Sequence, residues 1–282
     1  MQFLSFIPDE LMLKLQYKIK TGNRLDLKSP KRFTEKIQLY KLNYKNPIMA
    51  QCVDKYDVRE YVEKHGLGYI LNEVYGVYDN PYEVNFSILP KSFVIKDTLG
   101  GGGNAVIIVS DKSKMDEEKV RKQMQDWVDE PINKKHPGRE WVYDGRKHRI
   151  IIEKLIESNQ DMGGLKDYKF FCFHGKVEFV YVMGDRKVGD KVSVTILDRN
   201  FQPLLVKRVG DELFQHIEKP DNYEELLSIA ETLSQEFPHV RVDLYDENEK
   251  ILFGELTFYN ASGYMKYDPD EFDFEIGRKF II

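Results

Sequence analysis

The spacing of apolar residues changes along the chain, and each change predicts a different kind of element. Residues 9–45 are rich in Lys with scattered Leu and Tyr, which predicts helices broken near Gly22 and Pro30. From Phe93 onward, short apolar runs are separated by turn residues, a pattern typical of strands. Further helices are expected at 54–65, 112–128 and 221–233, and strands at 69–77, 93–96, 105–109, 148–156, 168–173 and 177–183. This order predicts an α+β chain, with a helical front followed by antiparallel sheets that carry helices on one side.

Strict alternation near the end of the chain predicts a hairpin with charged residues on one face. Apolar residues between positions 240 and 244 alternate with Arg241 and Asp243, and a polar turn separates them from a second apolar run. If Asp243 lies opposite Glu255, then Arg241 and Thr257 share their face, because side chains alternate with period two. Facing carboxylates repel, so a divalent cation such as Mg²⁺ between them makes the arrangement favourable. The alternative is a solvated hairpin face.

Composition and charge exclude several classes of protein. The chain has 282 residues, of which 32% are charged and 41% hydrophobic, with a net charge of −5, and is long enough for two or three lobes. It has no basic stripe of the kind that binds nucleic acid, and no apolar run long enough to span a membrane. Residues 1–8 lack the features of a signal peptide. Cys52 and Cys172 lie in unrelated contexts, so free buried thiols and a cytoplasmic location are expected.

Four consecutive glycines at 100–103 separate two predicted strands and form a candidate phosphate-binding loop. Glycines cost conformational entropy, but they let backbone N–H groups approach an anion closely. Lys96 ends the strand before the loop and could contact phosphate oxygens. No Gly-Lys-Ser/Thr follows and the loop joins strands, so it is not a Walker motif. The alternative is a flexible hairpin loop beside a surface lysine.

Glu153 and Lys154 interrupt an apolar strand that begins at Ile150. A buried carboxylate in such a strand needs a partner, because an unpaired buried charge is costly. An adenine amino group is one candidate for the partner of Glu153, and Lys154 is the other. From this segment alone, the purely structural interpretation is favoured.

Further cations and carboxylates follow in an order that favours phosphoryl transfer. Asp167 and Lys169 share one face of a predicted strand, and Arg186 follows the next strand. Each residue alone is more often a surface charge, so their joint order is the stronger signal. Phosphoryl transfer depends mostly on positioning and on charge stabilisation. The candidate set is Lys96, Lys169, Arg186, Arg241, Asp243 and Glu255.

This order of motifs resembles that of ATP-grasp enzymes, and in particular the TupA-like branch found in bacterial surface-polysaccharide gene sets. Beside Lys55, Lys96 and the glycine loop, the matching phrases are SPKRFTEKI at 29–37, DKYDVR at 54–59, DYKFFCFHGK at 167–176 and GELTFY at 254–259. The resemblance implies two α+β lobes whose antiparallel sheets grip ATP, after a mostly helical region. The expected divisions are 1–88 for the N-terminal helical region, 89–153 for the small (lid) subdomain, and 154–282 for the large subdomain with the metal site.

The resemblance also implies roles for single residues. ATP contacts are expected from Lys55, Lys96, Gly101, Gly102, Gly103, Glu153, Lys154, Leu155, Ile156 and Asp167, with 153–156 as the adenine hinge. The catalytic cations are expected to be Lys169, Arg186 and Arg241, and the Mg²⁺ ligands Asp243, Glu255 and Thr257. Many ATP-grasp enzymes have Asn at the position of Thr257, so Asn260 is the alternative third ligand. The loop also lacks the His-Gly-Ser-Gly character common in this branch.

The reaction implied by the resemblance is ATP-dependent amide formation through an acyl phosphate. The expected partners are a small-molecule or glycan carboxylate, such as a uronic acid, and an amine or amino acid, without nucleic acid. One alternative is an ATP-grasp kinase, which leaves phosphate on its product. Another is a metal-dependent glycosyltransferase, for which Asp268-Pro269-Asp270 has the D-x-D letters, although no Rossmann-like pattern precedes it and a turn is favoured.

Overall fold

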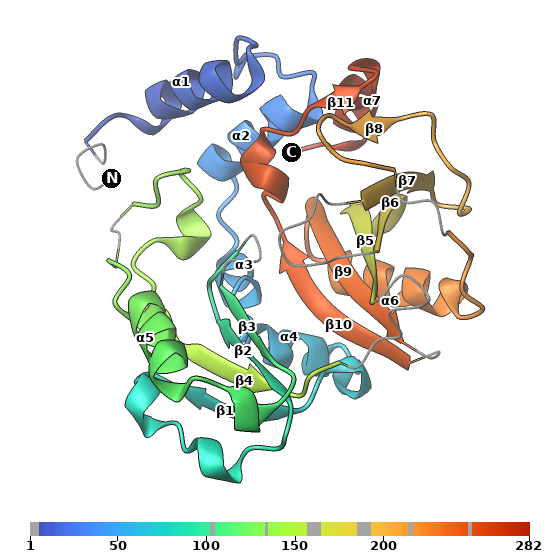
Figure 1. The fold of residues 1–282 in the computed structure, drawn as a ribbon. Coiled ribbons are helices and arrows are strands. Elements are labelled where there is room, and N and C mark those ends of the chain that lie inside the picture. The colour runs from blue at the N-terminus through green and yellow to red at the C-terminus, as the bar shows by residue number, and fades with distance from the viewer. Residues whose placement is uncertain are drawn as a thin grey trace.

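Two antiparallel sheets and a helical N-terminal segment make up the fold in this computed structural model (Figure 1). The structure describes residues 6–101, 105–132, 135–156, 165–184, 193–213, 217–247 and 250–282. The helices of this part are α1 (Asp9–Thr21), α2 (Phe33–Asn43), α3 (Pro47–Cys52), α4 (Val58–Lys64), α5 (Glu117–Val128), α6 (Tyr223–Ser234) and α7 (Glu271–Lys279). The predicted α+β class with antiparallel sheets is confirmed.

The smaller sheet has four strands in the order β1–β4–β2–β3, all paired antiparallel. These strands are β1 (Val74–Tyr78), β2 (Phe93–Asp97), β3 (Val106–Val109) and β4 (Ile150–Glu153). One face packs its apolar side chains, such as Ile95 and Ile152, against Val120 and Met124 of α5. Because side chains alternate along a strand, Lys96 and Glu153 lie on the opposite face, away from α5.

The larger sheet has five strands in the order β10–β9–β5–β6–β7. These strands are β5 (Lys166–Phe173), β6 (Lys176–Gly184), β7 (Ser193–Asp198), β9 (His239–Glu247) and β10 (Lys250–Thr257). Helix α6 covers one face, where the Cys172 thiol contacts the Ala230 carbonyl oxygen at 3.7 Å. The opposite face is apolar at one end, where the Phe33 ring of α2 packs edge-on against Phe173. Its other end is charged and carries Lys169.

The N-terminal helices hold the rest of the chain together. Helices α2, α3 and α4 contribute to the same apolar core as the larger sheet, and α2 also binds α7 through the Thr34 hydroxyl and Asp273, 2.7 Å apart. Helix α1 packs on this body through a small separate cluster that contains Leu13 and Tyr17. A short pair, β8 (Lys207–Arg208) and β11 (Tyr267–Asp268), lies near α7. Within the described residues, no helix has the length and apolar character to cross a membrane.

Most predicted elements are present, with shifted ends. The helix expected at 54–65 begins at Val58, because the Asp54 side chain first accepts hydrogen bonds from the N–H groups of residues 56 and 57. The helix expected from 112 begins after Asp116, whose side chain caps it by accepting from the Lys119 N–H at 3.0 Å. The strand predicted at 69–77 starts only at Val74, since Gly68–Ile70 is a 3₁₀ turn. Both cysteines are buried free thiols, as expected.

The predicted divisions of the chain stay predictions, but the sheet pairing bears on where the small lobe begins. Strand β1 comes from the segment assigned to the N-terminal region, and it pairs with β4 at the edge of the smaller sheet. The sheet therefore draws one strand from before residue 88 and three from after it. The strand predicted at 148–156 is shorter than expected, because β4 spans only Ile150–Glu153.

Candidate active site

Asp243 and Glu255 lie directly opposite each other in the β9–β10 ladder, and Arg241 lies opposite Thr257. The predicted hairpin register is therefore confirmed. The ladder contains a bulge between Phe253 and Glu255, and Gly254 occupies it. A Cβ at Gly254 would come within 2.9 Å of the Asp243 carbonyl oxygen, so a glycine is needed there for Glu255 to reach this position.

Cations of the chain itself separate the two carboxylates. The Arg241 guanidinium binds Asp243 through Nε at 2.6 Å and through Nη2 at 2.7 Å, and its Nη2 also binds Glu255 at 2.7 Å. Lys169 of the neighbouring strand β5 pairs with Asp243 and, at 2.8 Å, with Asp167. Facing carboxylates repel, and a divalent cation between them was predicted to offset this. Arg241 and Lys169 already offset part of the repulsion, and the metal stays a prediction.

Burial affects the two carboxylates differently. Asp243 is 1% exposed, and desolvation raises its pKa although Arg241 and Lys169 act against this. For Glu255, desolvation also acts to raise the pKa, but the charges of Arg241, Lys169 and Lys55 outweigh it and lower the pKa to about 2. With this pKa the Glu255 carboxylate is ionised at neutral pH. Its side chain is 43% exposed, so a ligand can reach it.

The oxygen atoms here fit a hard divalent cation. Asp243 and Glu255 supply carboxylates, and the Thr257 hydroxyl lies 2.9 Å from the Glu255 carboxylate. Such ligands suit Mg²⁺, which usually keeps one or two protein carboxylates and completes its shell with water and phosphate. The Asn260 side-chain oxygen already accepts a hydrogen bond from Arg241. Across the described ranges, no group of three or more His, Cys, Asp or Glu residues could hold a metal by itself.

Lys55 joins the two sheets. Its N–H donates to the Thr98 carbonyl oxygen at 2.9 Å, and its ammonium donates to the Gly100 carbonyl oxygen, just beyond the end of β2. Burial lowers the pKa of Lys55, and the negative charge of Glu255 on the larger sheet partly offsets this effect. The ammonium group therefore contacts the backbone at Gly100 and lies within electrostatic range of Glu255 on the larger sheet.

Lys96 and Glu153 form an ion pair of 2.7 Å on the face of the smaller sheet that is turned away from α5. Within the chain the partner of Glu153 is thus Lys96 and not Lys154, and the adenine amino group stays a prediction. Lys154 is exposed, and its N–H donates to the Glu73 carbonyl oxygen at 2.9 Å. Leu155 and Ile156 follow as half-buried residues without strand pairing. Of the four residues of the predicted adenine hinge, only Glu153 belongs to the sheet, and the chain leaves the sheet directly after it.

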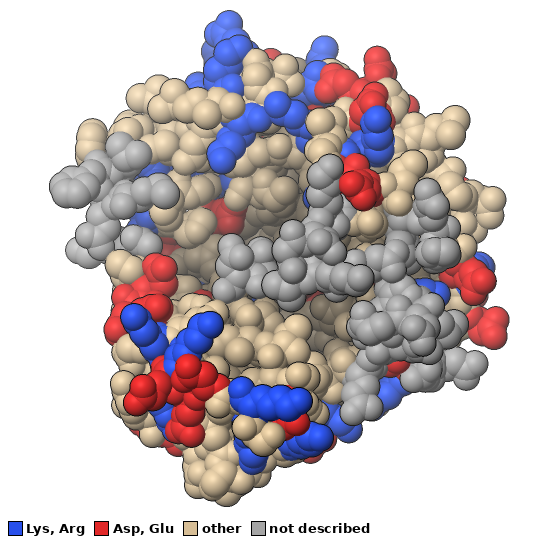
Figure 2. Space-filling model, in the orientation of Figure 1, with Lys and Arg blue, Asp and Glu red and all other residues tan. Residues whose placement is uncertain are grey.

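Only part of the predicted loop and of the catalytic set can be placed. Gly102, Gly103 and Arg186 lie outside the described residues, so their predicted roles stay predictions. Gly101 is exposed at the start of the loop. Gly100 is needed as a glycine, because a Cβ there would come within 2.1 Å of the Ala105 side chain. Figure 2 shows a hollow between the part of the molecule that holds α2 and the part that holds β2 and β3.

A cluster of two aspartates and two arginines beside the site was missed from the sequence. Arg149, just before β4, binds Asp54 at 2.9 Å and Asp57 at 2.7 Å, and Arg146 binds Asp57 at 3.0 Å. This aspartate–arginine cluster ties the segment that precedes α4 to the smaller sheet. The matching three-residue spacing of both pairs, 54 with 57 and 146 with 149, was a signal that could have found it.

His148 also lies near the start of the glycine loop. Its Nδ1 is 2.7 Å from the Asp97 carboxylate, and the hydrogen bond to Asp97 raises the pKa of the imidazole despite partial burial. The other Asp97 oxygen accepts the N–H of Leu99 at 3.0 Å. This pair fixes the backbone between β2 and the loop.

A second missed cluster surrounds Lys41 of α2. The Lys41 side chain is fully buried, donates to the carbonyl oxygens of Gly138 and Ser262, and lies 3.5 Å from the Glu140 carboxylate. Burial lowers the pKa of Lys41 to about 8, although Glu140 acts in the opposite direction. Ala261 and Ser262 have left-handed φ values of 44° and 54°. Lys41 and Glu140 hold this turn directly after Asn260, the residue that binds Arg241.

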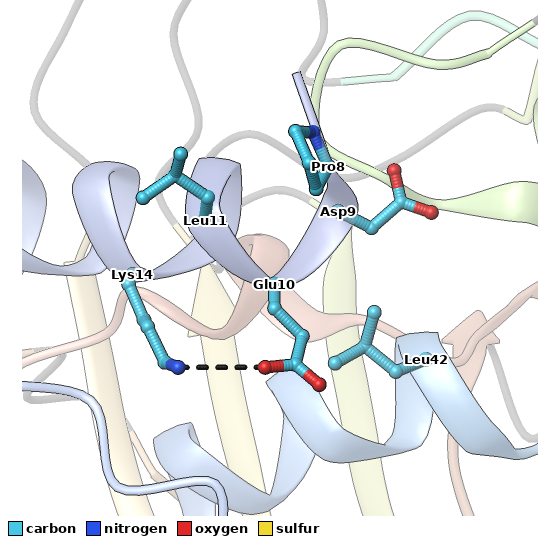
Figure 3. A pocket seen from close by; sticks show the side chains of 6 residues that line it. All are labelled: Pro8, Asp9, Glu10, Leu11, Lys14 and Leu42. Atoms are coloured by element: carbon cyan, nitrogen blue, oxygen red, sulfur yellow. Dashed lines mark hydrogen bonds and ion pairs between the residues drawn. The ribbon is translucent and has the colours of Figure 1, made fainter. Parts of the chain in front are cut away.

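The Asp268-Pro269-Asp270 segment and a hollow beside α1 are not part of the candidate site. In the D-x-D letters, Asp268 pairs with Lys207 at 3.2 Å and Asp270 with Arg32 at 2.6 Å, which favours the turn. A hollow of about 460 Å³ beside α1 is lined by Pro8, Asp9, Glu10, Leu11, Lys14 and Leu42 (Figure 3). None of these residues belongs to β9 or β10, and the two acids would repel phosphate, so this hollow is separate from the candidate site.

Comparison with known proteins gives a family match and distant structural similarities. A family model described as TupA-like ATPgrasp matches residues 35–281. No curated protein matches the chain significantly. The solved D-alanine–D-alanine ligase from Bacillus anthracis is 20% identical, with a TM-score of 0.44 over 73% of this chain and 57% of that one. An L-amino acid ligase from Bacillus licheniformis is 15% identical, with a TM-score of 0.48 over 82% of this chain and 49% of that one. The chain thus spans only about half the length of these two proteins.

Proposed function

The chain belongs to the TupA-like ATP-grasp family, and we propose that it is an ATP-dependent ligase that joins a carboxylate to an amine. The observation that supports this most directly is the position of Lys55. Its ammonium group contacts the backbone of the glycine loop and acts electrostatically on Glu255 of the other sheet. A nucleotide whose phosphates lie beside Lys55 would therefore reach the acid pair and the loop at once.

The residues on the smaller sheet are proposed to bind ATP. Lys55 and Lys96 hold the phosphates, the loop at 101–103 covers them, and 153–156 contact the adenine. Lys96 is paired with Glu153. When phosphate binds, the Lys96 ammonium group contacts both Glu153 and the phosphate, or it leaves Glu153 for the phosphate. The freed Glu153 carboxylate can then accept a hydrogen bond from an amino group of the base, which also satisfies its need for a partner.

The charged end of the larger sheet is proposed to stabilise the transferring phosphoryl group. Asp243, Glu255 and Thr257 would hold Mg²⁺, which supplies charge neutralisation and orientation for the phosphates. Lys169 and Arg241 bind the carboxylates and fix their orientation, and Asp167 orients Lys169. Arg186 is proposed to face the transferred phosphate, by its position in the family pattern.

The proposed reaction has two steps. A carboxylate oxygen of the acceptor attacks the γ-phosphorus of ATP, the bond to the β-phosphate oxygen breaks, and ADP leaves. The nitrogen of an amine then attacks the acyl carbon, inorganic phosphate leaves, and the amine gives up a proton. Phosphorylation is needed because a carboxylate repels nucleophiles and has no good leaving group. No covalent nucleophile of the protein is required.

The substrates are proposed from the family resemblance: a uronic acid or similar glycan carboxylate, and an amino acid or amine, in the cytoplasmic synthesis of a bacterial surface polysaccharide. The test incubates the protein with Mg²⁺ and ATP and with uronic acids and amino acids in pairs, and identifies products by mass spectrometry. A ligase forms an amide and releases phosphate in the second step only when both substrates are present, and its product has the combined mass of the two substrates less one water. A phosphorylated product that forms without any amine and survives hydroxylamine, which cleaves an acyl phosphate, would instead establish a kinase.

A further inference from the structure

Helix α1 presents an apolar stripe to solvent. Leu11, Leu15 and Ile19 recur every four residues and so share one helix face, and their exposed fractions are 59%, 52% and 69%. Phe6, just before the helix, is 80% exposed. An exposed Leu alone needs no explanation, but three large apolar side chains on one helix face, with a fourth just before the helix, are a patch of the kind that binds a partner or a lipid surface.

The exposure of this apolar stripe (Phe6, Leu11, Leu15 and Ile19) is not the result of a loosely attached helix. The inner face of α1 buries Met12, Leu13 and Tyr17. The Tyr17 hydroxyl lies 2.7 Å from that of Thr34 in α2, and the Gln16 side chain accepts a hydrogen bond of 2.8 Å from the Tyr264 hydroxyl. The helix is therefore fixed on one side and leaves its apolar stripe without a partner in the described part of the chain.

The charge around the apolar stripe favours a negatively charged partner. Between residues 6 and 32 the chain has seven Lys and Arg residues and three Asp and Glu residues, a net charge of +4, so the rest of the chain carries −9. Lys14 and Lys18 are exposed and lie three residues after Leu11 and Leu15, so they flank the apolar stripe, and Lys14 also pairs with Glu10 at 3.4 Å. In Figure 2, uncharged side chains cover α1 and basic ones stand beside them. Residues 6–32, called the basic segment below, thus carry a net positive charge, whereas the rest of the chain is acidic.

From this combination we propose that α1 docks on an anionic lipid surface, with the apolar stripe inserted at the headgroup–acyl boundary and the flanking lysines on the lipid phosphates. Helices that lie in a membrane interface combine such an apolar face with basic flanks. A second copy of the chain would bring two basic segments together, and their repulsion disfavours it. A nucleic acid would use the cations and leave the apolar side chains in water. The docking does not depend on the proposed ligase activity.

The test measures co-sedimentation of the whole protein with vesicles of two thirds phosphatidylcholine and one third phosphatidylglycerol, and with vesicles of phosphatidylcholine alone. The wild-type protein is expected to bind the anionic vesicles and to be released by high salt. The affinity of the double variant Leu15→Gln, Ile19→Gln for these vesicles should fall by about ten-fold or more, because two apolar side chains no longer leave water. Both positions are exposed, so the fold survives, and the melting temperature of each variant checks this.

Two further variants make the result specific. Leu205→Gln removes an apolar residue that is 97% exposed and belongs to neither α1 nor the basic segment, and it should bind like the wild type. Lys14→Gln with Lys18→Gln should weaken binding to anionic vesicles and leave any binding to phosphatidylcholine unchanged. Absence of wild-type binding to anionic vesicles overturns the proposal, as does an equal loss in Leu205→Gln. Concentration-dependent dimerisation that Leu15→Gln, Ile19→Gln abolishes would assign the apolar stripe to a second copy instead.

Discussion

Asp243 and Glu255 are direct partners across the β9–β10 ladder, yet the side chain of Asp243 is 1% exposed and that of Glu255 is 43% exposed. Arg241 contacts both. One carboxylate is thus part of a buried charge network, whereas the other faces the solvent from the same site. Removing the two charges should therefore have similar effects on catalysis and different effects on stability.

We predict that Asp243→Asn lowers the free energy of unfolding by about 3 kcal/mol, since it leaves Arg241 and Lys169 buried with less negative charge. Glu255→Gln should cost less than about 1 kcal/mol, as expected for a partly exposed ion pair. Denaturant titration measures both values. ATP turnover should be lost in each variant, because each lacks one proposed Mg²⁺ ligand. Turnover like that of the wild type in both would move the metal site away from this hairpin.

Lys96→Met should weaken binding of Mg·ATP about ten-fold to a hundred-fold, since one charge-assisted contact to phosphate is worth roughly 1.5–3 kcal/mol. It should also destabilise the fold, because Glu153 loses its partner. The double variant Lys96→Met, Glu153→Gln is the matched control: it should regain stability without regaining affinity. Calorimetric titration with ATP measures the affinity. If the double variant binds ATP like the wild type, Lys96 serves only to neutralise Glu153.

The stability contribution of Lys41 should depend on pH above neutrality. Its pKa is about 8 in the folded chain and 10.5 as the ordinary value, so between these values the unfolded chain binds more protons. Stability must then rise with pH in this window, by up to about 1.4 kcal/mol per pH unit. Lys41→Met removes this slope, and unfolding at several pH values measures the difference. Parallel curves for the two proteins would mean that Lys41 keeps its proton throughout.

His148 should show the opposite pH dependence. Its folded pKa is raised by Asp97, so its pairing stabilises the fold below the unfolded pKa of about 6.5, and this contribution is lost as pH rises through the folded value. The stability difference between wild type and His148→Gln should therefore shrink from acidic towards alkaline pH. Thermal unfolding in a pH series measures it, and Asp97→Asn should remove the same pH dependence. A difference that grows with pH would contradict this assignment.

The strand positions of the acid pair could be predicted because the information is local. Period-two alternation fixes which residues share a face within each strand, so Arg241 goes with Asp243 and Glu255 with Thr257. Their pairing across the ladder also depends on the bulge at Gly254, because counting from the turn alone places Gly254 opposite Asp243. The partner of Glu153 could not be found in this way. Lys96 is 57 residues away in the sequence, and no local pattern indicates that β2 and β4 are neighbours. Lys154, the neighbouring residue considered from the sequence, is exposed and is not the partner.

Lys41 was missed for a different reason. In a Lys-rich segment no single lysine was singled out, although Lys41 follows Phe33 and Ile37 at helical spacing and therefore falls on the buried face of α2. A charged residue on the apolar face of a helix predicts a buried partner, and this signal was available. The identity of the partner, Glu140, depends on the packing of distant segments, so the sequence did not indicate it.

The aspartate–arginine cluster has a consequence for how the two sheets can move. In the described part of the chain, the two sheets belong to separate apolar cores, and the contacts described between them are polar: Lys55 with the loop backbone, and Asp54 and Asp57 with Arg146 and Arg149. Parting apolar surfaces costs about 25 cal/mol per Å², and the contacts described between the sheets need no such parting. Asp54 is 1% exposed, and separating a buried ion pair is costly, so the cluster itself stays together as a fixed point. The smaller sheet can therefore swing about this cluster at low cost in free energy. A ligand that touches both sheets can fix their angle with a small part of its binding energy.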